Sequence, residues 1–159
     1  MKTPSGIATS NSSLVVADRV QKIYDTGSVI VNALKGVSLE VHAGEIVGVM
    51  GPSGCGKTTL LNCLSGIDDI TSGEVYVDGS PLTKLSDVKK TDFRAKKMGF
   101  IFQSYNLLPV LTAVENVEIP LLLTGTNQKE ARRRAVEMLE AVGLEGEAEK
   151  RPAEMSGGQ

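Results

Sequence analysis

The sequence is poor in the residues on which many catalytic and metal sites depend, with two cysteines and one histidine among 159 residues. Cys55 and Cys63 stand without a partnering cluster of His or Cys, which argues against a metal site. Cys55 precedes a predicted helix, where a thiol pKa can fall, so a redox role stands as an alternative to a small filler side chain. The single histidine, His42, has no catalytic companion and is interpreted as a turn residue.

Long apolar runs and basic blocks are also missing. The most apolar run, residues 119–123, is far shorter than the about 18 residues that a membrane helix requires. Residues 1–13 are small and polar, so we interpret them as a disordered lead-in and not as a secretory signal. The net charge of -2 without a basic block argues against a nucleic-acid partner. The hydrophobic content of 41% is typical of a soluble globular protein of one domain.

The most informative stretch is residues 51–59, which read G-P-S-G-C-G-K-T-T and contain the phosphate-loop pattern G-x-x-x-x-G-K-T. Residues 45–50 before it are apolar and β-branched, as in a buried parallel strand. Residues 59–64 after it favour a helix that ends near Gly66. A glycine-rich turn that merely joins a strand to a helix is the alternative.

The chemistry of this loop follows from its residue types. Glycine lets the backbone approach a ligand closely, and the free N–H groups at a helix N-terminus attract phosphate oxygens. Lys57 adds a full positive charge for the β- and γ-phosphates, and the Thr58 hydroxyl is a ligand for Mg²⁺. The candidate nucleotide-binding residues of the loop are Gly51, Ser53, Gly54, Cys55, Gly56, Lys57, Thr58 and Thr59.

Around the loop, the pattern predicts an α/β protein. Residues 14–24 and 33–41 read as two antiparallel strands joined by a turn at 25–27, and 74–79 as a further strand. Tyr24 ends the first strand, where its ring either packs or stacks on a nucleobase. Residues 98–102 read as a strand that delivers Gln103 at its C-terminal end, where α/β sheets bind ligands. Gln103 is therefore a candidate for Mg²⁺ or water, or a solvated amide.

The last third of the sequence predicts helices. Thr112 and Glu115 fit a capping box that opens one helix, and Asn127 with Glu130 fits a similar start. Apolar residues then recur at helical spacing, at Ala131, Ala135, Met138 and Val142. The three consecutive arginines at 132–134 are interpreted as an ion-paired face, since Glu130 and Glu137 lie four residues from Arg134 and Arg133.

Taken together, residues 14–159 resemble the nucleotide-binding subunit of ATP-binding-cassette transporters. Residues 51–59 match the Walker A motif of that family, and Phe102-Gln103 looks like its Q-loop. Tyr24 falls where the family has an aromatic that stacks on adenine, which favours the stacking alternative. The resemblance implies ATP and Mg²⁺ as cofactors, with Thr58 and Gln103 as metal ligands and Lys57 and Gln103 contributing to catalysis.

The end of the sequence carries a second motif of that family. Met155-Ser156-Gly157-Gly158-Gln159 looks like the L-S-G-G-Q signature, with methionine as a conservative exchange for leucine. In the family this motif acts in trans on the γ-phosphate of a partner, which implies a nucleotide-sandwich dimer. The resemblance also implies a membrane-spanning permease partner and a cytoplasmic location on the inner face of the membrane. Residues 100–109 and 112–117 are similar to the macrolide-export and lipoprotein-release (MacB/LolD-type) branch.

The fold expected is therefore a P-loop NTPase with a RecA-like parallel sheet, an antiparallel β start and a helical subdomain at about 104–155, within a partial domain spanning 14–159. The Walker B carboxylates and switch histidine of the family are not in the sequence, so we expect a fragment that binds ATP without turning it over. The function expected of the intact protein is ATP hydrolysis that drives export or lipoprotein extraction. The alternatives are a non-transport ATPase of the same superfamily and a non-catalytic nucleotide-binding module.

Overall fold

The computed structural model describes residues 13–102 and 104–159. These fold as two compact units, divided between Arg94 and Ala95, which we describe in turn. The predicted lead-in at 1–13 lies almost wholly outside the described residues, and so does Gln103. The predicted boundary of the helical subdomain stays a prediction.

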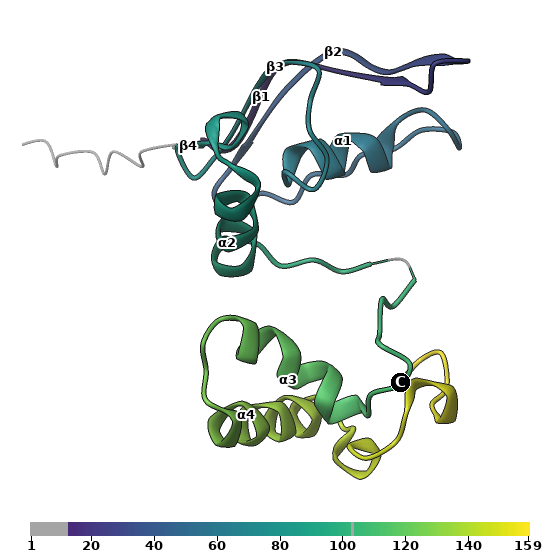
Figure 1. Cartoon of the computed structure of the whole chain (residues 1–159), viewed down its shortest axis with the longest axis vertical. Helices are drawn as coiled ribbons and strands as arrows, with labels where there is room; N and C mark the ends of the chain where they lie inside the picture. The colour runs from purple at the N-terminus through teal and green to yellow at the C-terminus, as the bar shows by residue number, and fades with distance from the viewer. Residues whose placement is uncertain (1–12, 103) are drawn as a thin grey trace, which may run out of the picture. The chain divides into compact units, whose positions relative to one another are not determined.

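The first unit is built on a four-stranded sheet with the order β2-β1-β3-β4 (Figure 1). Its strands are β1 (Ser13–Asp25), β2 (Ile30–His42), β3 (Ser72–Val77) and β4 (Ser80–Pro81), and every neighbouring pair is antiparallel. The antiparallel pairing predicted for the first two strands is confirmed, with Tyr24 opposite Val31 near the turn. Alternating apolar residues direct one face of this sheet inward.

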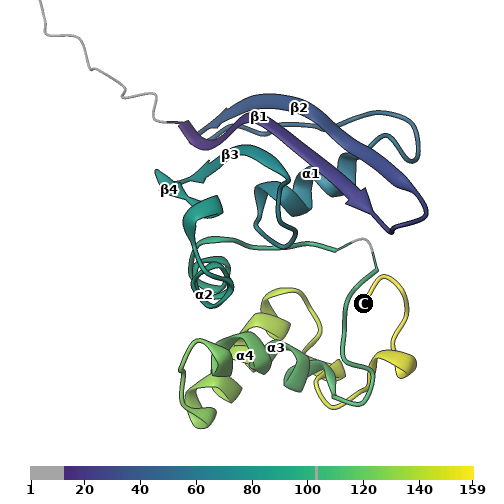
Figure 2. The same ribbon diagram turned by 45° about the horizontal axis from the view of Figure 1, so that its top comes forward.

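Helix α1 (Lys57–Leu64) lies against the sheet and contacts β1, β2 and β3 (Figure 2). The short 3-10 helix η1 (Leu82–Lys84) and helix α2 (Asp87–Lys97) follow β4. The buried apolar residues of this unit come from the sheet, α1 and η1: Ala17, Val20, Leu34, Leu60, Cys63, Val75, Val77 and Leu82. The start of α1, and with it the phosphate loop, is therefore anchored by the core of the unit.

Two segments predicted to be strands, residues 45–50 and 98–102, are not strands in the structure. Ile46 and Ile101 are fully exposed, at 101% and 103% of the reference area. A strand is defined by hydrogen bonds to a neighbour, and among the described residues neither segment has such a neighbour. Apolar, β-branched composition alone therefore does not make these segments strands.

The second unit contains a pair of helices, α3 (Ala113–Leu123) and α4 (Gln128–Ala141), followed by the 3-10 helices η2 (Glu145–Glu147) and η3 (Pro152–Glu154). Both predicted helix starts are confirmed. The Thr112 backbone N–H donates to the Glu115 carboxylate at 2.8 Å, and the Glu115 N–H donates to the Thr112 hydroxyl at 3.4 Å. At α4, the Asn127 side chain accepts from the N–H of Glu130 at 3.0 Å.

Helix α4 is amphipathic as predicted, but its buried stripe is displaced from the predicted one. Ala131 and Ala135 are fully buried, whereas Met138 is 53% and Val142 is 68% exposed. The third buried position is Leu139. Helix α3 covers the flank of the stripe on which Leu139 lies, and Val142 follows the last helical residue. The spacing of apolar residues predicts that α4 has an apolar stripe, whereas packing against α3 decides which flank of that stripe is buried.

The predicted ion-paired face on α4 is confirmed. Arg133 bonds the Glu137 carboxylate at 2.5 Å, and Arg134 bonds the Glu130 carboxylate at 2.6 Å. Arg132 instead pairs with Glu118 of α3. Two of the three arginines are thus engaged along their own helix at i,i+3 and i,i+4 spacing.

Candidate functional site

The predicted phosphate loop connects β2 to α1 in the first unit. Gly56 is the N-cap of α1 with φ 95° and ψ 8°, and Gly54 has φ 77°. Residues with a Cβ rarely adopt this backbone conformation. A Cβ on Gly56 would also lie 2.7 Å from the Ala33 carbonyl oxygen of β2, so the loop passes directly against the sheet at this point.

Lys57, the first residue of α1, turns its side chain back over this loop. Its ammonium group donates to the carbonyl oxygens of Gly51 at 2.9 Å and Pro52 at 2.7 Å. A third, longer contact of 3.7 Å joins it to the Cys55 sulfur. An ammonium group has three donors, so one of them is held only by a weak acceptor. The positive charge is therefore fixed above the loop with one donor easily released.

The first turn of α1 contributes further donors. The first four N–H groups of a helix have no acceptor within the helix, and the helix dipole adds partial positive charge there. Thr58 is exposed in this turn, as are Ser53 and Cys55 in the loop. Thr59, also in this turn, lies close enough to the Tyr24 hydroxyl to influence its pKa. Tyr24 and the first turn of α1 thus lie near each other.

Tyr24 is held by a small polar cluster at the end of β1. Its hydroxyl donates to the Asp68 carboxylate at 2.6 Å, and its side chain remains 37% exposed. The Lys22 ammonium lies 4.7 Å from the centroid of the Tyr24 ring. The same ammonium donates to Asp68 at 2.6 Å and to the Asp69 carbonyl oxygen at 2.6 Å. One carboxylate therefore binds both the phenol and the cation over its ring.

These contacts shift the acidity of the groups involved. The hydrogen bond to Asp68 raises the pKa of the Tyr24 phenol, and the Thr59 contact opposes it. Partial burial raises the pKa of Asp68, but the hydrogen bonds from Lys22 and Tyr24 outweigh it and leave that pKa below its usual value. Burial lowers the pKa of Lys22, and its hydrogen bond and charge interaction with Asp68 reverse the shift. At neutral pH the cluster is an ion pair with a neutral phenol.

The predicted signature lies in the second unit. Met155 is half-buried and packs against the core of α3 and α4, which contains Val114, Ala135 and Leu139. The remaining four signature residues are exposed, and they are Ser156, Gly157, Gly158 and Gln159.

The signature forms a turn of its own. The Ser156 N–H donates to the Gln159 side-chain oxygen at 2.8 Å, and the Gln159 N–H donates to the Ser156 carbonyl oxygen at 3.0 Å. A Cβ on Gly157 would lie 3.1 Å from the Tyr105 hydroxyl. Glycine at 157 therefore leaves room for the Tyr105 side chain beside the turn.

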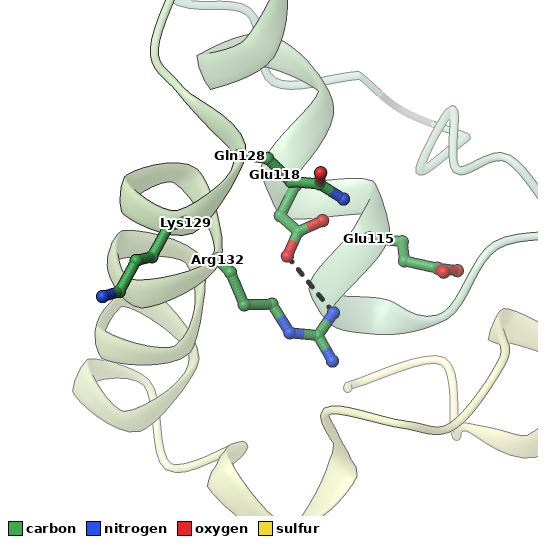
Figure 3. A pocket seen from close by; sticks show the side chains of 5 residues that line it. All are labelled: Glu115, Glu118, Gln128, Lys129 and Arg132. Atoms are coloured by element: carbon green, nitrogen blue, oxygen red, sulfur yellow. Dashed lines mark hydrogen bonds and ion pairs between the residues drawn. The ribbon is translucent and has the colours of Figure 1, made fainter.

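A separate hollow of about 460 Å³ lies on the second unit between α3 and α4 (Figure 3). Its lining is polar and comprises Glu115, Glu118, Gln128, Lys129 and Arg132. Arg132 already donates to Glu118 at 3.2 Å and to Glu149 at 2.5 Å. The charge of this arginine is thus engaged by acidic side chains of its own unit.

The loop geometry fits a phosphate group. Gly54 and Gly56 allow the positive φ angles of the loop, Lys57 supplies a cation, and the start of α1 supplies N–H donors. For a metal ion, the described residues contain no group of three or more His, Cys, Asp or Glu side chains. Among the described residues, the exposed Thr58 hydroxyl is the group that would hold Mg²⁺, an ion that commonly keeps several waters and binds phosphate oxygens.

Three residues around Tyr24 were not predicted from the sequence: Lys22, Asp68 and Asp69. The pairing of Lys22 with Asp68 spans 46 positions, so local patterns do not reveal it. The alternation within residues 14–24 did place Lys22 and Tyr24 on the same face of the strand, which is the one signal available.

The chain is similar to known proteins over most of its length. The sequence profile of the family described as ABC transporter matches residues 34–159. An uncharacterized ABC transporter ATP-binding protein of Thermotoga maritima is 51% identical over 140 residues. This alignment covers 88% of the chain and 60% of the relative. The chain thus spans about three fifths of the length of that relative.

Solved structures of the cassette MJ0796 are also similar. Its dimeric structure in a post-hydrolysis state, bound to ADP and Pi, has a TM-score of 0.83 and 44% sequence identity. A second dimeric structure, described as a bacterial ABC transporter cassette, gives the same values. Each covers 91% of this chain and 64% of the solved chain. These similarities confirm the predicted α/β class and P-loop NTPase fold.

Proposed function

The chain belongs to the ABC transporter family of ATP-binding proteins, and from that premise we propose that it binds ATP with Mg²⁺ through the loop at residues 51–59. The observation that carries the proposal is the position of the Lys57 ammonium above a loop that two positive-φ glycines open at the start of α1. The weak contact of this ammonium with the Cys55 sulfur is the one that a phosphate oxygen replaces.

The remaining site residues take the following roles in this proposal. Tyr24 stacks on the base, and the N–H groups of the loop and of Thr58 and Thr59 bind the phosphates. The Thr58 hydroxyl ligates Mg²⁺, which neutralises phosphate charge when bound. Gln103 is proposed as a further ligand of Mg²⁺ or of the attacking water, and it lies outside the described residues.

We further propose that the chain acts as one half of a head-to-tail dimer. The relative MJ0796 is dimeric in both solved structures, which supports this assembly. In such a dimer, residues 155–159 of one subunit would contact the γ-phosphate bound by the other. Exposure of Ser156 and of the two glycines after it leaves their polar groups accessible for that contact.

A membrane-spanning permease is the second partner proposed, and the subunit would lie at the inner face of the membrane through it. Among the described residues, no helix combines the length and apolar character needed to cross a membrane. The similarity of residues 100–109 and 112–117 to the macrolide-export and lipoprotein-release branch supports an export or lipoprotein-extraction complex. The exposed apolar residues between 104 and 111, which include Leu107, Leu108 and Val110, support a contact with such a partner.

We propose ATP binding for this chain and ATP hydrolysis for a longer protein. The residues that hold phosphate are present in the described structure, so ATP binding is proposed for the chain itself. Hydrolysis coupled to transport is proposed for a protein with the full length of the relatives, of which this chain covers 60% to 64%.

The test is ATP binding by the purified 159-residue chain, measured by isothermal titration calorimetry with Mg²⁺. Lys57→Ala should weaken ATP binding by about tenfold or more, since a hydrogen bond to a charged group contributes about 1.5–3 kcal/mol. Lys89→Ala, which removes an exposed lysine on α2, is the matched control and should leave the affinity unchanged. Failure of the parent chain to bind ATP, or equal binding by Lys57→Ala, would refute the proposal.

A further inference from the structure

At the end of β1, Lys22 and Asp68 hold the Tyr24 ring, which stays partly exposed. Asp68 accepts hydrogen bonds from both Lys22 and Tyr24, each at 2.6 Å. The Lys22 side chain is only 12% exposed, although its charge makes burial costly without a partner. The turn that carries Asp68 is itself tied to β1, where the Ile23 N–H donates to the Thr71 hydroxyl at 2.9 Å. Asp68 is therefore held to β1 both through its own side chain and through the turn that carries it.

The position of the Lys22 ammonium makes the two faces of the Tyr24 ring unequal. A cation 4.7 Å from the ring centroid occupies one face. A planar base can then stack only on the opposite face. The hydrogen bond to Asp68 fixes the position of the phenol oxygen, and with it the outer end of the ring.

The Thr59 contact also relates the ring to the phosphate loop. Thr59 lies in the first turn of α1, two residues after Lys57 turns back over the loop. A ligand that carries both a base and a phosphate chain gains affinity when its two subsites are held at a fixed separation. Loss of the hydrogen bond between Asp68 and Tyr24 would therefore weaken binding of the whole nucleotide and leave the phosphate subsite intact.

We propose that Asp68 is a positioning residue for base recognition, which orients the Tyr24 ring directly through its hydroxyl and indirectly through Lys22. This inference rests on the function proposed above, and specifically on stacking by Tyr24. It assigns to Asp68 a contribution to the preference for a nucleoside triphosphate over a bare phosphate chain. A purely structural role would affect both ligands alike.

The experiment compares ATP with inorganic tripolyphosphate on the full 159-residue chain by isothermal titration calorimetry. Tyr24→Phe removes only the hydroxyl, and Asp68→Asn removes the charge at nearly constant volume. The matched control is Tyr76→Phe on β3, which removes another phenol bound to a carboxylate, that of Glu74. Far-UV circular dichroism of each variant verifies folding, and Tyr24→Phe decides alone if Asp68→Asn fails to fold.

We expect each of the two variants to weaken ATP binding by about two- to tenfold, the range for one net hydrogen bond, with tripolyphosphate affinity unchanged. The double variant should bind ATP no more weakly than the more affected single variant, because both substitutions act on the same hydrogen bond between Tyr24 and Asp68. Tyr76→Phe should change neither affinity.

Equal weakening of ATP and tripolyphosphate would overturn the inference, because it would show that the cluster acts on the loop or on the fold. Unchanged ATP affinity in both single variants would also overturn it. A separate variant, Tyr24→Ala, tests stacking itself. If it keeps the full preference for ATP over tripolyphosphate, the stacking role of Tyr24 fails, and the positioning role of Asp68 with it.

Discussion

Gly56→Ala is the substitution whose effect can be worked out most fully from the structure. Gly56 joins the phosphate loop to α1 with φ 95°, and an added Cβ would lie 2.7 Å from the Ala33 carbonyl oxygen. That oxygen belongs to the backbone of β2, so no flexible side chain can move aside to relieve the contact. Gly54, with φ 77° and nothing within 4 Å of an added Cβ, is the matched control.

The two substitutions share one cost and differ in another. Placing alanine in the left-handed region costs about 1–2 kcal/mol at either position. The reduced freedom of the unfolded chain returns about 0.4–1 kcal/mol. Gly54→Ala should therefore lower the free energy of unfolding by about 1 kcal/mol. Gly56→Ala adds the strain of overpacking, about 1–3 kcal/mol, for a total of about 2–4 kcal/mol.

Urea denaturation followed by circular dichroism measures both values. Tripolyphosphate binding by the same proteins shows whether displacement of α1 from β2 also disturbs the cradle. We expect Gly56→Ala to weaken tripolyphosphate binding more than Gly54→Ala does. Equal losses of stability for the two variants would refute the reasoning, because the close approach of Gly56 to β2 would then have no energetic consequence.

Three further predictions concern the second unit. Leu139→Ala should lower the free energy of unfolding by about 2–5 kcal/mol, whereas Met138→Ala should change it by less than about 0.5 kcal/mol, as measured by urea denaturation. Reversed magnitudes would mean that the other flank of α4 is buried. Thr112→Ala should cost about 1 kcal/mol through loss of the helix cap, and unchanged thermal stability would contradict this. Hydrogen bonds from Arg133 hold the pKa of Glu130 at about 2, below its ordinary 4.5, so its stabilisation is complete above pH 4.5 and is lost as pH falls through about 2. Acid titration of the helical signal tests this, and an unchanged acid limb in Glu130→Gln would contradict it.

Much of the local structure was predictable from the sequence. The capping pair Thr112 and Glu115 marks the start of α3, and Asn127 marks the start of α4, because caps act over three residues. The phosphate loop was predictable for the same reason, since its glycines, Lys57 and the following helix are contiguous. The antiparallel pairing of β1 with β2 follows from alternation on either side of a short turn.

Long-range packing decided the rest. Residues 45–50 have the composition of a strand, yet a strand depends on a neighbour that composition does not supply. The flank of α4 that is buried depends on where α3 lies, which the helical period leaves open between Met138 and Leu139.

The candidate site divides in the same way. The sequence by itself predicted the candidate phosphate loop and determined the family, because these depend on a contiguous motif and on similarity along the chain. Only the tertiary structure brought Asp68 to Tyr24 and placed Lys22 over the ring. The physical reason is that hydrogen bonds between side chains depend on distances in space, and folding reduces 44 positions of chain between Tyr24 and Asp68 to 2.6 Å.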